Sequence, residues 1–104
     1  MIPAVLKRTE ELAGLCDRYH VLRLSLFGSA AAGGFDPDGS DLDFLVEFAT
    51  LPPRERADAY FGLLQDLETL FGREIDLLES GPARRNPFLR RSIEETQLTV
   101  YEAA

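Results

Sequence analysis

The chain has 104 residues, about the size of one small domain, and 45% of them are hydrophobic, so it can bury a core. Its one cysteine, Cys16, excludes an internal disulfide framework and is typical of the reduced cytoplasm. The net charge of −7 argues against broad contact with nucleic-acid phosphates and suits a metal site or a basic partner. No apolar stretch approaches the roughly 20 residues of a membrane span, and the N-terminus lacks a signal-like segment. We therefore expect one soluble domain, residues 1–104, with no membrane association.

Two elements are expected before the first glycine pair. Residues 3–19 predict an amphipathic helix with a buried stripe of Val5, Leu12, Leu15, Cys16 and Tyr19. Residues 21–27 alternate, which predicts a strand with Leu22, Leu24 and Leu26 on one side and Arg23 and Ser25 on the other. Cys16 is interpreted as a core residue. His20, between the two elements, is interpreted as a solvent-touching junction residue.

A glycine-serine turn follows the first strand. The strand ends at Phe27-Gly28-Ser29, where glycine permits a tight turn and a close approach of the backbone. Ala30, Ala31 and Ala32 can then start a helix, whose free N–H groups favour phosphate as a ligand. Residues 33–40 consist of turn-forming residues and return the chain to a second strand.

The second strand carries the candidate metal ligands Asp41 and Asp43. They are two residues apart, so the pleat places both on one face with Cα atoms roughly 6.5 Å apart. The opposite face is apolar and is formed by Leu42, Phe44, Val46 and Phe48. An exposed strand face is the alternative, but like charges on one face repel without a cation. We therefore favour a metal site.

The rest of the chain predicts two helices and two strands. The first helix begins at Pro52-Pro53, ends near Phe71 with Gly72 as its cap, and has a stripe of Ala57, Tyr60, Phe61, Leu64, Leu67 and Phe71. A strand at 74–79 carries a third acid, Asp76, and is closed by Ser80-Gly81-Pro82. A short helix over 87–95 and a strand over 98–101 complete the chain. A basic cluster comprises Arg84, Arg85, Arg90 and Arg91. We interpret it as the solvent-exposed surface of the last helix and of the residues leading into it, in preference to a contact with triphosphate or a partner.

This ordered set of motifs resembles the minimal nucleotidyltransferases, or MNT domains, of the DNA polymerase beta superfamily. The resemblance covers nearly the whole chain and rests on Phe27-Gly28-Ser29, then Ser40-Asp41-Leu42-Asp43-Phe44, then Ile75-Asp76-Leu77. It implies an α/β (α+β) nucleotidyltransferase fold, with a small mixed β-sheet and helices packed on one face. The three acids are then expected at one end of the sheet or on its open face.

The resemblance also implies a reaction, the transfer of AMP from ATP with two Mg²⁺ ions. In-line displacement of pyrophosphate develops charge on both the attacking and the leaving oxygen, and two metal ions can neutralise it. By resemblance, Asp41 and Asp43 bridge both metals, and Asp76 completes the metal that activates the incoming hydroxyl. Gly28, Ser29 and Ser40 are expected to hold the β- and γ-phosphates.

Short MNT domains resemble the antitoxin of a pair whose toxin is a HEPN-domain ribonuclease. The resemblance implies a hetero-oligomer in which AMP is added to a toxin tyrosine, with no direct contact to nucleic acid. Ala32 stands where the family has a basic residue, so the triphosphate is less neutralised unless Arg90 or Arg91 substitutes. Two alternatives stay open: a weak or inactive domain that neutralises the toxin by binding, and a small-molecule nucleotidyltransferase that needs a partner subunit.

Overall fold

The computed structural model describes residues 4–28, 31 and 42–103. They form a 3₁₀ helix, four α-helices and four strands: η1 (Ala4–Arg8), α1 (Thr9–Arg18), β1 (Val21–Phe27), β2 (Leu42–Phe48), α2 (Pro53–Phe71), β3 (Ile75–Glu79), α3 (Ser80–Arg85), α4 (Pro87–Thr96) and β4 (Leu98–Glu102). The strands make one sheet in the order β3-β2-β1-β4. β1 is antiparallel to both β2 and β4, whereas β2 and β3 are parallel. The sheet is therefore mixed, as predicted.

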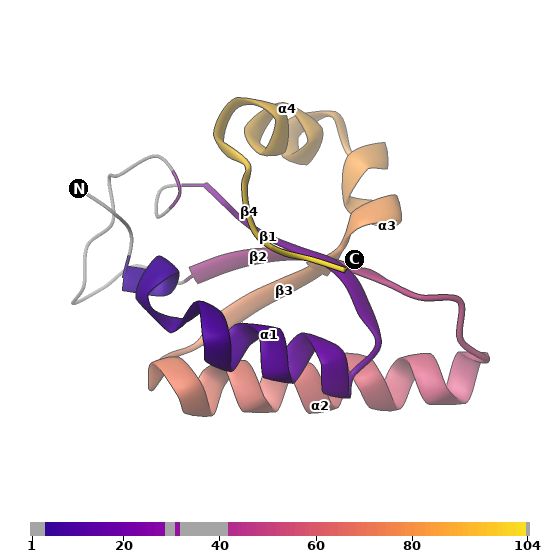
Figure 1. Ribbon diagram of the computed structural model, residues 1–104. Coiled ribbons are helices and arrows are strands. Elements are labelled where there is room, and N and C mark those ends of the chain that lie inside the picture. Colours follow the sequence, from indigo (N-terminus) through magenta and orange to yellow (C-terminus); the bar gives the residue numbers. More distant parts are fainter. Residues whose placement is uncertain (1–3, 29–30, 32–41, 104) are drawn as a thin grey trace.

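Helices lie on both sides of this sheet. The amphipathic helices α1 and α2 cover one face, and the helices α3 and α4 lie over the other (Figure 1). The expectation of helices on one face thus holds for α1 and α2, and α3 and α4 add a second layer. The reason is that Phe27 and Leu45 are apolar on the second face and bury themselves against Ala83 and Ile93. The α/β fold class is confirmed, with this additional layer.

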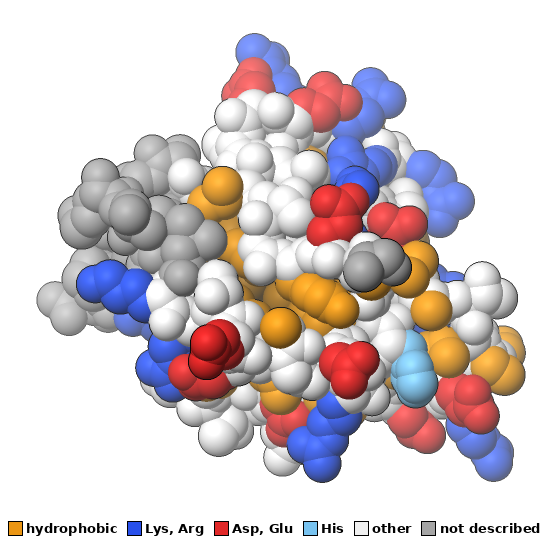
Figure 2. Space-filling model, viewed as in Figure 1, with side chains coloured by type: hydrophobic (Ala, Val, Ile, Leu, Met, Phe, Trp, Pro, Cys, Tyr) orange, Lys and Arg blue, Asp and Glu red, His pale blue; other side chains and the backbone are white. Residues whose placement is uncertain are grey.

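Charged side chains of both signs are spread over the visible surface (Figure 2). Ion pairs among the described residues include Arg23 with Glu102 at 2.6 Å and Arg56 with Glu79 at 2.7 Å. Exposed pairs of this kind contribute little to stability, typically about 0–1 kcal/mol. No helix in the described ranges is both long enough and apolar enough to cross a bilayer. The fold therefore depends mainly on its buried apolar side chains.

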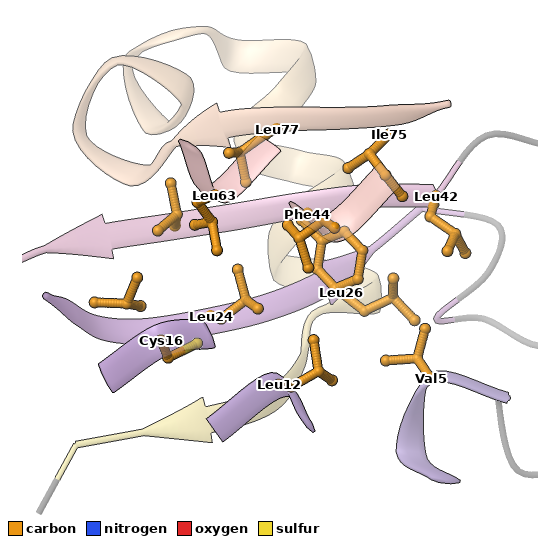
Figure 3. Packing of buried hydrophobic residues seen from close by; sticks show 13 residues of the cluster. Val5, Leu12, Cys16, Leu24, Leu26, Leu42, Phe44, Leu63, Ile75 and Leu77 are labelled. Carbon is orange, nitrogen blue, oxygen red and sulfur yellow. The ribbon is translucent and has the colours of Figure 1, made fainter. Parts of the chain in front are cut away.

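The main core lies between the sheet and the α1–α2 layer. Side chains from both helices and from β1, β2 and β3 point toward one another there (Figure 3). Leu12, Leu24, Phe44 and Leu63 are fully buried in it. Cys16 is also buried, as predicted, and burial raises the pKa of its thiol to about 12. Cys16 is therefore an unreactive core residue.

Two details of the N-terminal half differ from expectation. The helix predicted over residues 3–19 begins as the 3₁₀ segment η1 before α1 starts at Thr9. Leu22, expected on the buried side of the first strand, is 42% exposed, and Val21 is buried instead. The cause is a register shift between Val21 and Arg23 in the pairing of β1 with β2, because the extra residue interrupts the alternation.

The buried stripe of α2 is rotated relative to the prediction. Leu67 is buried as expected, but Ala57 and Phe61 are exposed, and the fully inward positions are Ala59, Leu63 and Leu67. These three follow an exact four-residue spacing. Apolar residues occupy neighbouring positions 59–61 and 63–64, so periodicity alone left the face ambiguous.

The segment after β3 is a helix, not the closing turn that Ser80-Gly81-Pro82 suggested. α3 spans Ser80–Arg85, and Pro82 falls in its first turn, where a missing N–H costs no hydrogen bond. α4 follows directly, and its N-cap Asn86 accepts hydrogen bonds from the N–H groups of Phe88 and Leu89. α3 and α4 therefore form one compact layer over the second face of the sheet.

Candidate functional site

Two of the three predicted acids lie on neighbouring strands at one end of the sheet. Asp43 of β2 and Asp76 of β3 are register partners in the parallel pair, so their Cα atoms are about 4.8 Å apart. Their neighbours Phe44 and Leu77 belong to the main core, so alternation turns both acids toward the opposite face. Asp43 is half-buried and Asp76 is exposed. Two acids far apart in sequence thus lie together where β2 and β3 begin.

β3 is fixed to α2 on both sides of Asp76. The Ile75 N–H donates to Glu68 Oε2 at 3.4 Å, and the Tyr60 hydroxyl donates to the Leu77 carbonyl at 2.6 Å. Burial raises the pKa of Tyr60, and the nearby charges of Glu79 and Asp76 raise it further, so the hydroxyl keeps its proton. The apolar pattern of α2 assigns Tyr60 to the packing stripe alone, and no sequence pattern marks Glu68. Together these contacts hold the strand that carries Asp76.

Gly28 lies against the carboxylate of Asp43. β1 ends at Phe27, which is the register partner of Asp43, and Gly28 follows with a φ of 77°. A Cβ built on Gly28 would lie 2.6 Å from Asp43 Oδ2, closer than real contacts allow. Glycine is therefore required here for two reasons, its backbone conformation and the close approach to an acid. The glycine of the predicted turn is adjacent to the predicted acid.

The Gly28 turn is also tied to α4. The Gly28 N–H donates to Thr96 Oγ1 at 2.8 Å, and the Thr96 hydroxyl donates to the Ser92 carbonyl at 2.6 Å. No sequence motif marks Thr96, because a single threonine at the end of a short helix belongs to no recognisable pattern. Because the Gly28 N–H is already hydrogen-bonded to Thr96, it is not available to a ligand. Gly28 instead allows a ligand to come close to its backbone, since it has no side chain.

The remaining predicted site residues, Ser29, Ala32, Ser40 and Asp41, lie outside the described residues. Within the described ranges, no three His, Cys, Asp or Glu side chains gather into a group that could hold a metal ion. The described part of the site is a pair of acids, Asp43 and Asp76, next to Gly28. Carboxylate oxygens are among the ligands that Mg²⁺ prefers.

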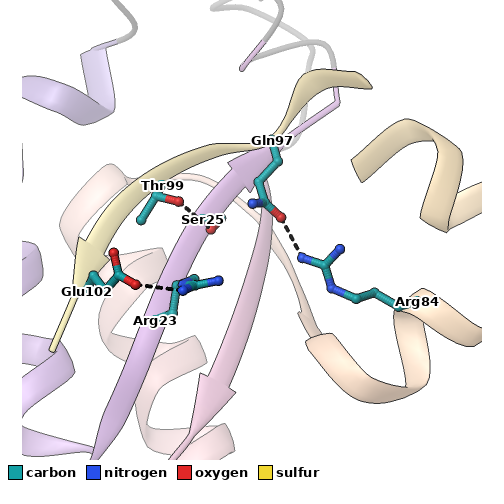
Figure 4. A network of polar contacts seen from close by, with 6 residues as sticks. All are labelled: Arg23, Ser25, Arg84, Gln97, Thr99 and Glu102. Atoms are coloured by element: carbon teal, nitrogen blue, oxygen red, sulfur yellow. Dashed lines mark hydrogen bonds and ion pairs between the residues drawn. The ribbon is translucent and has the colours of Figure 1, made fainter. Parts of the chain in front are cut away.

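The basic cluster divides into residues with different surroundings. Arg84 donates to Gln97 Oε1 at 2.6 Å and to Ser80 Oγ at 3.0 Å, so it links α3 to the end of α4 (Figure 4). Arg91 pairs with Glu95 on the exposed side of α4 at 3.0 Å. Arg84 is thus a structural residue of the second layer. Arg85 and Arg90 are exposed.

A cavity of about 350 Å³ lies away from the two acids. It is lined by the far ends of β2 and β3, including Val46, Phe48 and Glu79, together with Ser80 and Arg85. Val46 and Glu79 are register partners three positions further along the strands than Asp43 and Asp76. The cavity is therefore separate from the acid end of the sheet.

This combination of a mixed sheet, paired acids and an adjacent glycine turn is that of a nucleotidyltransferase. Residues 9–98 match the family of the nucleotidyltransferase domain. The chain belongs to this family, and the predicted family resemblance is confirmed. The comparison with curated proteins gives no match.

Solved structures are similar over most of the chain. A structure described as a minimal nucleotidyltransferase candidate is 30% identical, with a TM-score of 0.62, and the alignment covers 94% of this chain and 95% of that one. A toxin-antitoxin crystal structure with AMP-PNP is 20% identical, with a TM-score of 0.64 and coverage of 91% and 73%. A tri-AMPylated Shewanella oneidensis HEPN toxin in complex with its MNT antitoxin gives 18% identity, a TM-score of 0.63 and coverage of 95% and 73%. This chain thus resembles MNT antitoxins in fold.

Proposed function

We propose that this nucleotidyltransferase domain transfers AMP from ATP to a tyrosine hydroxyl of a partner HEPN-domain toxin and so acts as its antitoxin. The observation that carries the proposal is the pairing of Asp43 with Asp76 on adjacent strands, with Gly28 against the Asp43 carboxylate. Similar folds come from a toxin-antitoxin crystal with AMP-PNP and from a complex whose HEPN toxin is tri-AMPylated. Both support this donor and this class of acceptor.

The acids are proposed to hold two Mg²⁺ ions, with Asp41 joining Asp43 and Asp76. Two carboxylates at register positions on adjacent strands repel each other, and a cation bound between them would offset that repulsion. When bound, the metal ions would supply charge stabilisation to the attacking and leaving oxygens of the transfer. The chain contributes hard oxygen ligands on two strands that the main core holds rigid.

The phosphates of ATP are proposed to lie over the Gly28 turn, with Ser29 and Ser40 as donors. Without a side chain at Gly28, a ligand can approach the backbone beside Asp43. Ala32 supplies no charge there, and Arg90 is the proposed substitute, because Arg91 already pairs with Glu95. The chain is also proposed to work in the cytoplasm, in keeping with its single cysteine, and to form a hetero-oligomer with the toxin.

The test is a transfer assay with a HEPN-domain toxin as acceptor. With ATP and Mg²⁺, the acceptor should gain about 329 Da for each AMP transferred, the mass set by phosphoryl transfer chemistry. Asp43→Asn and Asp76→Asn should each abolish the added mass, because each removes a proposed metal ligand. Asp58→Asn on the exposed side of α2 is the matched control and should leave transfer unchanged. Added mass that persists in both site variants would contradict the proposal.

Ala32 favours a second candidate, an antitoxin that neutralises its partner by binding alone. The same assay separates the two, because a binding module would protect against the toxin without adding mass. Asp43→Asn would then neutralise the toxin as well as the wild type does. Ala32→Arg sharpens the distinction. In an active enzyme it should transfer AMP at least as fast as the wild type, whereas in a binding module neither protein should add mass.

A further inference from the structure

The hydroxyl of Thr96 is held in one orientation. It donates to the Ser92 carbonyl at 2.6 Å, one turn back along α4, and it accepts the N–H of Gly28 at 2.8 Å. These two bonds fix the hydroxyl proton on one side and direct an oxygen lone pair to Gly28 on the other. The last residue of α4 is thus a fixed acceptor for the turn that ends β1.

The backbone of Gly28 in turn determines how much room the Asp43 carboxylate has. A Cβ built on Gly28 would lie 2.6 Å from Asp43 Oδ2 and 3.6 Å from Asp43 Cγ. A small displacement of the Gly28 peptide would therefore either crowd this carboxylate or release it. The Gly28 backbone thus lies beside one oxygen of the acid, and its position limits the orientations open to the carboxylate.

α4 is itself anchored independently of this contact. Ile93 is fully buried in the second apolar cluster, where it packs with Phe27 and Leu45 under the helix. Arg84 holds Gln97, the residue after Thr96, through a 2.6 Å hydrogen bond (Figure 4). Thr96 is therefore supported on both sides, by a buried side chain and by a link to α3.

We infer that Thr96 is a positioning residue for Asp43: its hydroxyl holds the Gly28 peptide, and that peptide sets the orientation of the Asp43 carboxylate. Its relevance to AMP transfer rests on the function proposed above. Thr96 acts only through Gly28 and is distinct from the residues proposed to hold metal or phosphate. α4 thereby connects the second layer of the fold to the candidate site.

The test compares Thr96→Val, which keeps the shape but removes the hydroxyl, with Thr96→Ser, which keeps the hydroxyl. Thr99→Val is the control, since Thr99 is an exposed residue of β4 with a 3.5 Å contact to Ser25. The first readouts need neither metal, ATP nor partner: amide hydrogen exchange of Gly28, and the Asp43 Cγ chemical shift at pH 7. Thr96→Val should speed Gly28 exchange about 10-fold, as expected for one lost hydrogen bond, and should shift the Asp43 signal. Thr96→Ser and Thr99→Val should resemble the wild type.

The second readout is the transfer assay. Loss of a residue that orients a metal ligand typically costs about 10- to 100-fold in activity or metal affinity, so Thr96→Val should slow transfer or raise its metal requirement by that factor. Thr96→Ser should restore it. Unchanged Gly28 exchange and an unchanged Asp43 signal in Thr96→Val would overturn the inference even if transfer is observed. If both signals change but no protein, including the wild type, transfers AMP, the positioning inference stands and the proposed function fails.

Discussion

The two faces of the sheet differ in what they bury. Under α1 and α2, the buried inward residues of three strands are apolar and include Leu24, Leu26, Phe44 and Leu77. Under α3 and α4, the strands contribute Phe27 and Leu45 to the buried apolar cluster, with Leu78 packed against it. Asp43 is half-buried on this same face, two residues before Leu45. At the first face, Glu79 is half-buried in an ion pair with Arg56 of α2, at the end of β3 far from Asp76. The second face keeps a half-buried carboxylate, that of Asp43, beside its small core.

This difference separates stability from chemistry along the same strands. Phe44 and Leu77 contribute to the main core, and the residues immediately before them, Asp43 and Asp76, face the other way. A carboxylate pair needs a rigid support but gains little from burial, because desolvation penalises charge. The apolar face therefore provides the rigidity, and the mixed face remains available to a ligand.

The largest expected effect is on the apolar face. Leu63→Ala should lower the free energy of unfolding by about 2–5 kcal/mol, because Leu63 is fully buried and its loss leaves a cavity. Urea denaturation measures this, and the activity per folded molecule should stay at the wild-type level. Phe61→Ala, on the same helix but with a side chain 66% exposed, is the control and should cost no more than about 1 kcal/mol. Similar losses in both variants would remove the distinction between the two sides of α2.

A smaller effect is expected at the two glycines with positive φ. Gly28 and Gly72 have φ values of 77° and 64°, so alanine should cost about 1–2 kcal/mol of backbone strain at either position. A Cβ at Gly72 has open space, whereas at Gly28 it would meet Asp43. Gly28→Ala should therefore lose more stability than Gly72→Ala and should also lose AMP transfer, while Gly72→Ala keeps it. Equal transfer by both variants would mean that the Gly28 contact does not matter to the site.

Sequence patterns predicted most of the elements of this fold. Alternation in β2 correctly assigned Leu42, Phe44 and Val46 to the core. The bulge at Leu22 and the face of α2 were missed, because both depend on how elements pack and not on local periodicity. α3 was missed because Ser80-Gly81-Pro82 is typical of a turn, and only the apolar second face explains a helix there.

The site was predicted in part. The order of Gly28, Asp43 and Asp76 along the chain indicated the right family, but the register that aligns the two acids depends on long-range strand pairing. Thr96 lies 68 residues from Gly28, and no local signal marks such a contact. The metal and phosphate roles of all the candidate residues stay predictions. Asp41, Ser29 and Ser40 also lie outside the described ranges.

The central claim is that Asp43 and Asp76 form a cation site, and a thermal melt with and without Mg²⁺ and ATP tests it most directly. Without cation, Asp43→Asn and Asp76→Asn should still fold and melt cooperatively, because asparagine keeps the size and shape of the aspartate side chain. With Mg²⁺ and ATP, the wild type should gain stability, about 2.7 kcal/mol at a ligand concentration 100 times its Kd, and neither variant should. A wild-type melting temperature that does not respond to Mg²⁺ and ATP, or variants that respond equally, would contradict the account.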